Sequence, residues 1–230
     1  MNDNKAKEII DTIVGQIFGY QKPYSLEQFA AKFAFDIRLT SEVFDYQTGE
    51  STWAQNTKSN KYVKFANLTG SADDSLIPKE EINSIEDILR IWQKTNITGA
   101  ERYLNSSDVA KSDAVYGSQL IYRSINIIES KNLAFCETVQ NSEYCAAMQR
   151  SNNCVYSLRI DDSKQISKSF QVSWSDNISN SFFIKDSSNL SDCMFCSQIK
   201  GQRFCIANMQ LEEAEYRKWE QVIKSWILSN

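Results

Sequence analysis

The chain has 230 residues, of which 42% are hydrophobic and 23% are charged, and its net charge is −4, a balance typical of soluble globular proteins. It contains no histidine, which excludes histidine-dependent catalytic triads and histidine metal sites, and its acidic balance argues against binding nucleic acid through positive charge. We see no signal sequence and no apolar run long enough to span a membrane, so we expect a cytoplasmic protein without a membrane partner.

We expect residues 1–102 to form an α+β N-terminal cap domain. Apolar side chains recur at helical spacing over residues 4–18, and Ser25 with Gln28 forms the capping-box pattern of a second helix through residue 35. The remaining predicted elements are strands at 36–39, 42–46, 51–53 and 61–65, a polar loop at 69–78, and a helix at 84–96 with Ser84 as its cap.

A strict three-residue repeat organises the second half of the chain. All 32 positions sampled at every third residue from Ser106 to Ile199 are Ser, Cys, Val, Ile, Leu or Met, and all six cysteines share this register. Period three is neither helical nor the period of a flat strand, so the chain must turn at regular intervals. A second column is apolar at a spacing of twelve: Ala134, Ala146, Leu158, Phe170, Phe182, Met194 and Ile206. One full turn therefore takes twelve residues.

The two spacings predict a narrow β-solenoid over residues 103–208, with about eight coils stacked at the inter-strand spacing of about 4.8 Å. Each coil sends two serines and two aliphatic side chains inward, and the serine hydroxyls satisfy backbone carbonyls. The coil resembles the 12-residue coils of beetle antifreeze proteins, which imply right-handed winding. Ice binding is rejected, because the stretch has only one threonine, Thr138, and no two cysteines six residues apart. The hexapeptide helix of acyltransferases fits less well, because its coil has 18 residues and its catalysis relies on histidine.

The cysteines support two interpretations. Cys193, Cys196 and Cys205 are weak candidates for a zinc site, for which the histidine-free chain supplies no fourth histidine ligand. The preferred interpretation is structural, because every cysteine occupies an inward position. Along the solenoid, serines fill one set of inward columns before residue 136 and the other set after residue 151. Four inward residues of intermediate size lie where the columns exchange: Cys136, Cys145, Met148 and Cys154. We therefore expect no cofactor and no metal, and a reducing compartment.

The outer apolar column needs a cover, because so long an exposed stripe would be adhesive. We expect residues 209–230 to form a C-terminal amphipathic helix, from Glu212 to Leu228, that lies on the stripe or caps the solenoid. If the stripe is not covered in this way, it is an interaction face. The residues of this predicted interaction face are Leu158, Phe170, Phe182, Phe183, Met194, Phe195, Ile206, Trp219 and Trp226.

The end of the repeat carries a likeness to a known group of proteins. The segments Cys193–Cys196, Arg203–Gln210 and Glu213–Tyr216 are similar to the closing segment of uncharacterised Cys-rich repeat proteins of candidate-phylum bacteria. In those proteins a CxxC pair precedes a Tyr-Cys-Ile-x-Asn-Lys-Gln-Tyr run and an acidic Glu-Glu-Tyr helix start. This chain departs from that pattern at Phe204, Met209 and Leu211. The resemblance implies the same architecture and carries no activity with it.

The leading hypothesis is a non-enzymatic module whose rigid solenoid presents a face to a protein partner or to copies of itself. The alternative is an enzyme or ligand-binding protein with a site where the N-terminal domain meets the first coils, lined by Tyr46, Glu50, Trp53 and Tyr103. We interpret the nearby acidic side chains of Asp36, Asp45 and Glu50 as surface charges, since no nucleophile or phosphate-binding loop accompanies them.

Overall fold

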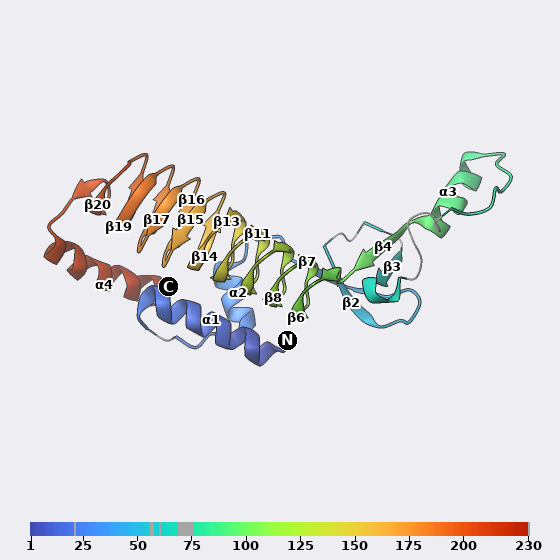
Figure 1. The fold of residues 1–230 in the computed structure, drawn as a ribbon, viewed down its shortest axis with the longest axis horizontal. Helices are drawn as coiled ribbons and strands as arrows, with labels where there is room; N and C mark the ends of the chain where they lie inside the picture. Colours follow the sequence, from blue (N-terminus) through green and yellow to red (C-terminus); the bar gives the residue numbers. More distant parts are fainter. Residues whose placement is uncertain (21, 56–57, 60, 69–75, 230) are drawn as a thin grey trace.

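The computed structural model describes residues 1–230 except 21, 56–57, 60, 69–75 and 230. N-terminal helices and small sheets come first, a parallel β-solenoid follows, and a C-terminal helix ends the chain (Figure 1). This confirms the predicted fold class. The boundaries at residues 102 and 208 stay predictions, although the first solenoid strand begins at Tyr103 and the last parallel strand ends at Ile206.

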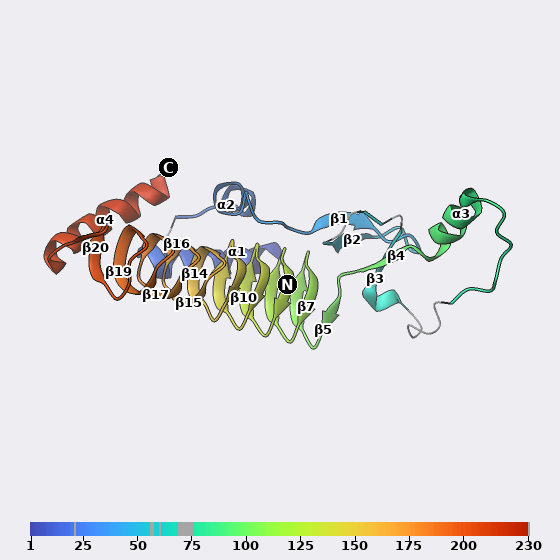
Figure 2. The same ribbon diagram turned by 90° about the horizontal axis from the view of Figure 1, so that it is seen from above.

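The solenoid has about nine turns of about twelve residues, one more than the sequence predicted. Residues twelve apart are register partners on neighbouring parallel strands, as Leu133 is with Ile121 and Cys145. The rod is thus one continuous parallel sheet wound on itself (Figure 2). Its parallel strands are β5 (Tyr103–Leu104), β6 (Ser107–Ala110), β7 (Asp113–Tyr116), β8 (Gln119–Tyr122), β9 (Ile125–Ile128), β10 (Lys131–Ala134), β11 (Glu137–Gln140), β12 (Glu143–Ala146), β13 (Gln149–Asn152), β14 (Val155–Asp161), β15 (Lys164–Ser167), β16 (Phe170–Ser173), β17 (Asp176–Ser179), β18 (Phe182–Lys185), β19 (Ser188–Ser197) and β20 (Arg203–Ile206).

The inward serines form hydrogen-bonded ladders along the rod. The hydroxyl of Ser118 donates to the carbonyl of Tyr116 (2.8 Å) and accepts the N–H of Ser130, one coil further on (3.0 Å). Ser130 repeats the pattern with Ile128 and Ser142. The sequence predicted the bond to the carbonyl but not the bond to the next coil. Each serine therefore joins two coils inside a tube where water cannot replace either bond.

The chain bends at residues in the left-handed backbone conformation, and one such residue directly precedes each inward residue. From residue 105 to residue 204 every third residue has a positive φ. Two of these residues are glycines, at 117 and 201, and all the others carry a side chain. Thr138 is one of them, with φ 54°. This conformation costs a residue with a side chain on the order of 1–2 kcal/mol, so the stacked ladders must offset it. The left-handed residues explain how a chain with period three closes a coil of twelve.

The cysteines occupy the positions that the repeat predicts. All six are buried free thiols. In the zone where serine and aliphatic ladders exchange, the thiol of Cys136 takes the serine role and donates to the carbonyl of Ala134 at 3.4 Å, while its N–H donates to the hydroxyl of Ser124. The predicted exchange zone of buried Cys136, Cys145, Met148 and Cys154 is confirmed.

Helix α1 (Asp3–Phe18) is the main cover of the outer apolar stripe, which corrects the expectation that the C-terminal helix alone would do this. It runs along the solenoid beside β8, β10, β12 and β14 (Figure 1). At its end the ring of Phe18 packs against Phe170 and Phe182, with centroids 5.6 and 5.9 Å apart. Its amphipathic spacing buries seven of its own side chains there: Ala6, Ile9, Ile10, Ile13, Val14, Ile17 and Phe18.

Two further helices complete this layer. Helix α2 (Leu26–Phe33), which has the predicted capping box, places Phe29 against Phe135 and Phe33 against Phe170. Helix α4 (Glu213–Ser229) follows the short strand β21 (Met209–Gln210) and joins the same core through Tyr216, Ile227 and Leu228. Helices α1 and α2 therefore lie along the rod, whereas the sequence placed them in a cap at its end.

The small sheets lie at the first end of the solenoid. Strands β1 (Ser41–Phe44) and β2 (Ser51–Ala54) form an antiparallel pair, and β3 (Lys61–Lys64) pairs in parallel with β4 (Ile97–Ala100). A short 3-10 helix, η1 (Phe65–Asn67), follows β3. The predicted strand at 36–39 is wrong, because those residues form a turn and an extended link after α2. Most of the predicted loop at 69–78 lies outside the described residues.

Candidate interaction surface

Helix α3 (Ile85–Thr95) is built by local signals in its own sequence. The side chain of Ser84 accepts the N–H of Asp87 at its start, and the Asp87 carboxylate accepts the N–H of Asn83 in return. Glu86 and Asp87 lie in the first turn and Lys94 in the last, where each charge opposes the end of the helix dipole. The predicted helix at 84–96 is confirmed, and it forms without support from a tertiary core.

Ion pairs fix the polar side of α3. Arg90 and Lys94 both bind the carboxylate of Glu80, at 3.0 and 2.7 Å, and Arg90 also reaches Asp87. These bonds hold the incoming chain against the polar side of the helix. They also lower the pKa of Glu80, chiefly through the hydrogen bonds from Lys94 and Arg90, so the pairs stay charged at neutral pH. The segment before the helix is thus kept on the side opposite its apolar residues.

The apolar side of α3 is open to solvent. Ile85, Ile88, Leu89 and Trp92 recur at positions i, i+3, i+4 and i+7, and are 60, 45, 48 and 54% exposed. None of the residues of α3 is buried. In both ribbon views the helix stands beyond β3 and β4, at the opposite end of the molecule from α4 (Figures 1 and 2). We call these four side chains the α3 face.

The chain that leads to the helix has exposed apolar side chains of its own. Leu76, Ile77 and Ile82 are also exposed, and Leu76 is 88% so. Single exposed apolar residues are common on proteins, whereas the four neighbouring side chains of the α3 face make that face a candidate interaction surface. The sequence analysis predicted this helix and assigned no role to its apolar side.

Only part of the interaction face that the sequence predicted lies on the surface. Four of its residues, Leu158, Phe170, Phe182 and Met194, are buried in the core beneath the helices, and Ile206 packs against that core. They therefore cannot meet a partner while α1, α2 and α4 are in place, which corrects their assignment as surface residues. The remaining members are Phe183, Phe195, Trp219 and Trp226.

These remaining residues lie beside α4. Phe183 and Phe195 stack with ring centroids 4.5 Å apart, and Trp226 lies 6.1 and 6.5 Å from them. Phe195, Trp219 and Trp226 are exposed, while Phe183 is half-buried. A smaller aromatic patch therefore exists at the end of the molecule distant from the α3 face.

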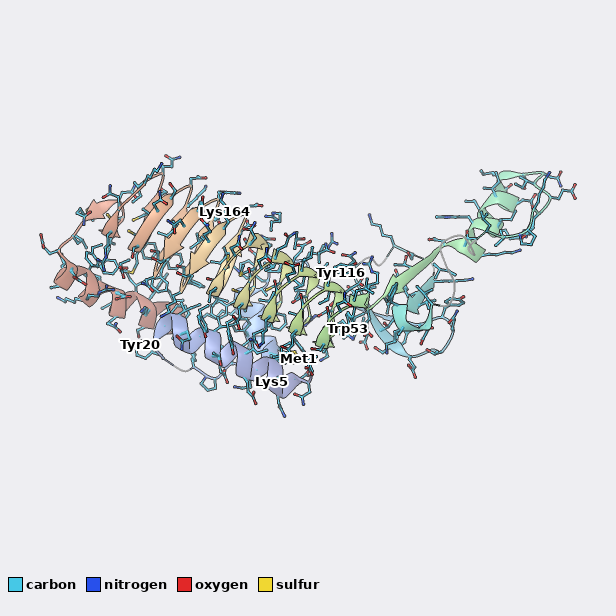
Figure 3. The ribbon with its side chains drawn as sticks, in the orientation of Figure 1. Met1, Lys5, Tyr20, Trp53, Tyr116 and Lys164 are labelled. Carbon is cyan, nitrogen blue, oxygen red and sulfur yellow. The ribbon has the colours of Figure 1, made fainter. Side chains whose placement is uncertain are left out.

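Three of the four residues of the alternative junction site have partners of their own. The hydroxyl of Tyr103 donates to the carbonyl of Ser112 at 2.9 Å, and burial raises the pKa of Tyr103. Tyr46 lies under the ammonium of Lys61, and Glu50 is exposed. Trp53 lies where the small sheets meet the first coils (Figure 3), with the guanidinium of Arg123 over its ring.

Buried carboxylates near this junction have structural partners. Asp45 accepts the N–H groups of Gln47, Thr48 and Lys64, and the last of these is the largest cause that lowers its pKa. Of the three acidic residues interpreted as surface charges, Asp45 is thus buried, which corrects that interpretation. Asp36 is exposed and pairs with Arg159 at 2.9 Å. Both carboxylates therefore have structural partners that stabilise the local backbone.

A polar groove of about 680 Å³ runs along one side of the later coils, lined by Arg150, Asn152, Asp162, Lys164, Trp174, Asp176 and Asp186 among others. Arg150 binds Asp162 at 2.9 Å and Lys164 binds Asp176 at 3.4 Å. Two of its three carboxylates are therefore paired with a cation. Among the described residues no group of three or more Cys, Asp or Glu side chains is arranged to hold a metal ion, and this includes Cys193, Cys196 and Cys205.

None of the described helices combines the length and the apolar character needed to cross a bilayer. Comparisons with models of protein families, with curated proteins and with solved structures found no match to this chain. The likeness of the closing segment to Cys-rich repeat proteins therefore stays a prediction, and the function must be argued from the surface itself.

Proposed function

We propose that the protein is a non-enzymatic interaction module that docks the α3 face into an apolar groove of another protein chain. The observation that carries this proposal is the exposure of Ile85, Ile88, Leu89 and Trp92 on one side of a helix that packs on no other described element. An amphipathic helix with anchors at i, i+3, i+4 and i+7 is a recurrent form of protein recognition. Trp92 is the expected anchor, since large aromatic residues dominate binding energy.

The charges of α3 favour a protein groove over a lipid surface. Helices that lie on membranes carry Lys and Arg along their polar side. Here the polar side mixes Glu86 and Asp87 with Arg90 and Lys94, and Glu80 neutralises the last two. A groove in a protein needs no excess of positive charge, so the apolar contacts alone select it.

The solenoid serves this function as a rigid body. Its coils are cross-linked by the serine ladders, and α1 ties them along their length. Six buried free thiols favour a reducing compartment, which we propose to be the cytoplasm. The similarity to Cys-rich repeat proteins contributes architecture to this proposal and no activity.

The first test measures self-association of the full chain by light scattering during gel filtration, from about 5 to 200 μM. Dimers that dissociate in Leu89→Ser, but not in the control Gln93→Ser on the same helix, identify a second copy as the partner. If the chain stays monomeric, a photo-reactive phenylalanine analogue at position 92 captures the partner in cells that encode this protein.

The captured partner is then purified and titrated against the wild type and both variants. Because Leu89 lies at the centre of the α3 face, we expect Leu89→Ser to weaken binding at least 30-fold, while Gln93→Ser stays within about twofold. Equal affinity of Leu89→Ser and wild type would overturn the proposal. So would a monomer whose position 92 cross-links to no protein.

A further inference from the structure

The last coils of the solenoid hold three buried thiols. Cys193 and Cys196 lie in β19 and Cys205 lies in β20, and all three are buried inside the tube. No further coil stacks on the outer edge of β20, which is paired only with the two-residue strand β21. The cluster therefore lies directly beneath the end of the rod.

Cys193 is the centre of the cluster. It is the register partner of Cys205 on the adjacent parallel strand. Neighbouring strands are about 4.8 Å apart, which falls within the Cα separation of about 4.4–6.8 Å that a disulfide spans. Cys196 is the next inward residue of the same strand, and its thiol donates to the carbonyl of Cys205 at 3.7 Å. The Cys205 thiol donates to Oε1 of Gln210 at 3.5 Å, so one side chain of β21 separates it from the rod's end.

We propose that Cys193 and Cys205 form a disulfide when the protein meets a hydroperoxide, and that Cys196 is the thiolate that reacts first. The Cys196 sulfur attacks one peroxide oxygen, the O–O bond breaks, and an alcohol or water leaves with one proton. Cys193 then attacks the resulting sulfenic acid, the S–O bond breaks, and water leaves with the Cys193 proton. Cys205 displaces Cys196 from Cys193, and the proton of Cys205 returns to Cys196. In sum, two thiols lose two electrons and two protons, which the hydroperoxide takes up.

The three other cysteines provide an internal contrast. Burial raises the pKa of Cys136 to about 12 and that of Cys154 to about 11, so both remain protonated at neutral pH. At Cys196 the hydrogen bond from Cys193 lowers the pKa below the ordinary thiol value. Because only the thiolate is nucleophilic, the first attack is expected at Cys196. The middle cysteines also have complete coils on both sides, which keep a peroxide out.

The two columns that end in this cluster call for different variants. Cys193 and Cys205 continue the column of Ser157, Ser169 and Ser181, and the hydroxyl of Ser181 accepts the N–H of Cys193 at 3.0 Å. Cys205→Ser therefore changes the sulfur and keeps a side chain that this column accommodates. Cys196 continues the aliphatic column of Ile160, Val172 and Ile184, so its variant is Cys196→Ala. Circular dichroism of each variant verifies that the solenoid is retained.

The experiment treats the full chain with one equivalent of hydrogen peroxide, blocks free thiols with N-ethylmaleimide in denaturant, and maps tryptic peptides by mass spectrometry. Trypsin separates residues 186–200, which contain Cys193 and Cys196, from residues 204–217, which contain Cys205. We expect these two peptides to be linked through Cys193, and the peptides with Cys136, Cys145 and Cys154 to carry the blocking group. Fragmentation of the linked pair identifies which cysteine of 186–200 is bonded.

The variants separate the steps. Cys205→Ser is expected to stop at a Cys193–Cys196 bond inside peptide 186–200, and Cys196→Ala is expected to form the Cys193–Cys205 bond at least tenfold more slowly. Oxidation of all six cysteines at one rate, a wild-type product bonded between Cys193 and Cys196, or unchanged free thiols would each overturn the proposal. None of these results depends on a partner of the α3 face, so the two proposals are tested independently.

Discussion

Removing one ladder hydroxyl tests whether the serines hold the coils together. Ser124 is fully buried, donates to the carbonyl of Tyr122 at 2.8 Å and accepts the N–H of Cys136 at 3.0 Å. In Ser124→Ala the Tyr122 carbonyl still accepts the N–H of Phe135 at 3.0 Å. The N–H of Cys136 is left without an acceptor in a place that water does not reach. The variant therefore isolates one orphaned backbone donor.

The expected cost follows from that single group. A buried donor without a partner costs about 1–3 kcal/mol. In a chain of this size each kcal/mol lowers the midpoint of thermal unfolding by about 2–4 °C, so we expect a decrease of roughly 2–12 °C. The Cys136 amide itself should exchange its hydrogen at least tenfold faster in the variant, since the bond that protects it is lost.

Thermal unfolding followed by circular dichroism and amide exchange followed by NMR measure the two effects. Ser197→Ala is the matched control, because Ser197 is exposed and outside the inward register, and it should change stability by no more than about 0.5 kcal/mol. If Ser124→Ala unfolds at the temperature of Ser197→Ala and the Cys136 amide remains protected, the ladders do not hold the coils.

Three further predictions concern the turns, the cover and the thiols. Thr138→Gly relieves a β-branched residue at φ 54° and should stabilise the chain by about 0.5–1 kcal/mol in thermal unfolding, whereas Glu137→Gly should destabilise it. Ile10→Asp puts a charge beneath α1, so we expect dye binding and light scattering from the uncovered stripe, which an unchanged monomer would contradict. Because burial raises the pKa of Cys136 to about 12, the folded chain binds more protons than the unfolded chain above pH 8.5. Stability should therefore decrease from pH 8.5 to 10.5, and less steeply in Cys136→Ser.

The solenoid was predictable because its interior restricts every third residue to six small or aliphatic types. The spacing of twelve came from a single outer column, in which Leu158, Phe170 and Phe182 alternate with polar positions half a coil away. The left-handed turns were not predictable from residue type. Some of these positions hold residues that accept the conformation readily, such as Asn105 and Asp108, while others hold Phe135 or Thr138. Stacking therefore overrides the local preference of the chain.

Which helix packs on the outer apolar stripe could not be predicted from the sequence, for a different reason. Helices α1 and α4 are both amphipathic, and periodicity shows that each must bury a face without showing against what. The decisive contacts, such as Phe18 with Phe170, join residues about 150 positions apart. The residue sizes along the stripe agree with this arrangement. Ala134 and Ala146 are small enough to let a helix backbone approach the solenoid, whereas Phe170 and Phe182 are too large.

Helix α3 shows where the same reasoning leads to a function. Its apolar spacing also predicts a buried face, and the sequence therefore placed it within a cap domain. The ion pairs of Glu80 with Arg90 and Lys94 explain the difference, because they hold the preceding chain on the polar side of the helix. The segment before α3 therefore does not cover the apolar side of the helix, whose four apolar side chains are 45–60% exposed. We propose that this face, which carries the pattern of a core and has no core in its own described chain, is completed by another protein chain.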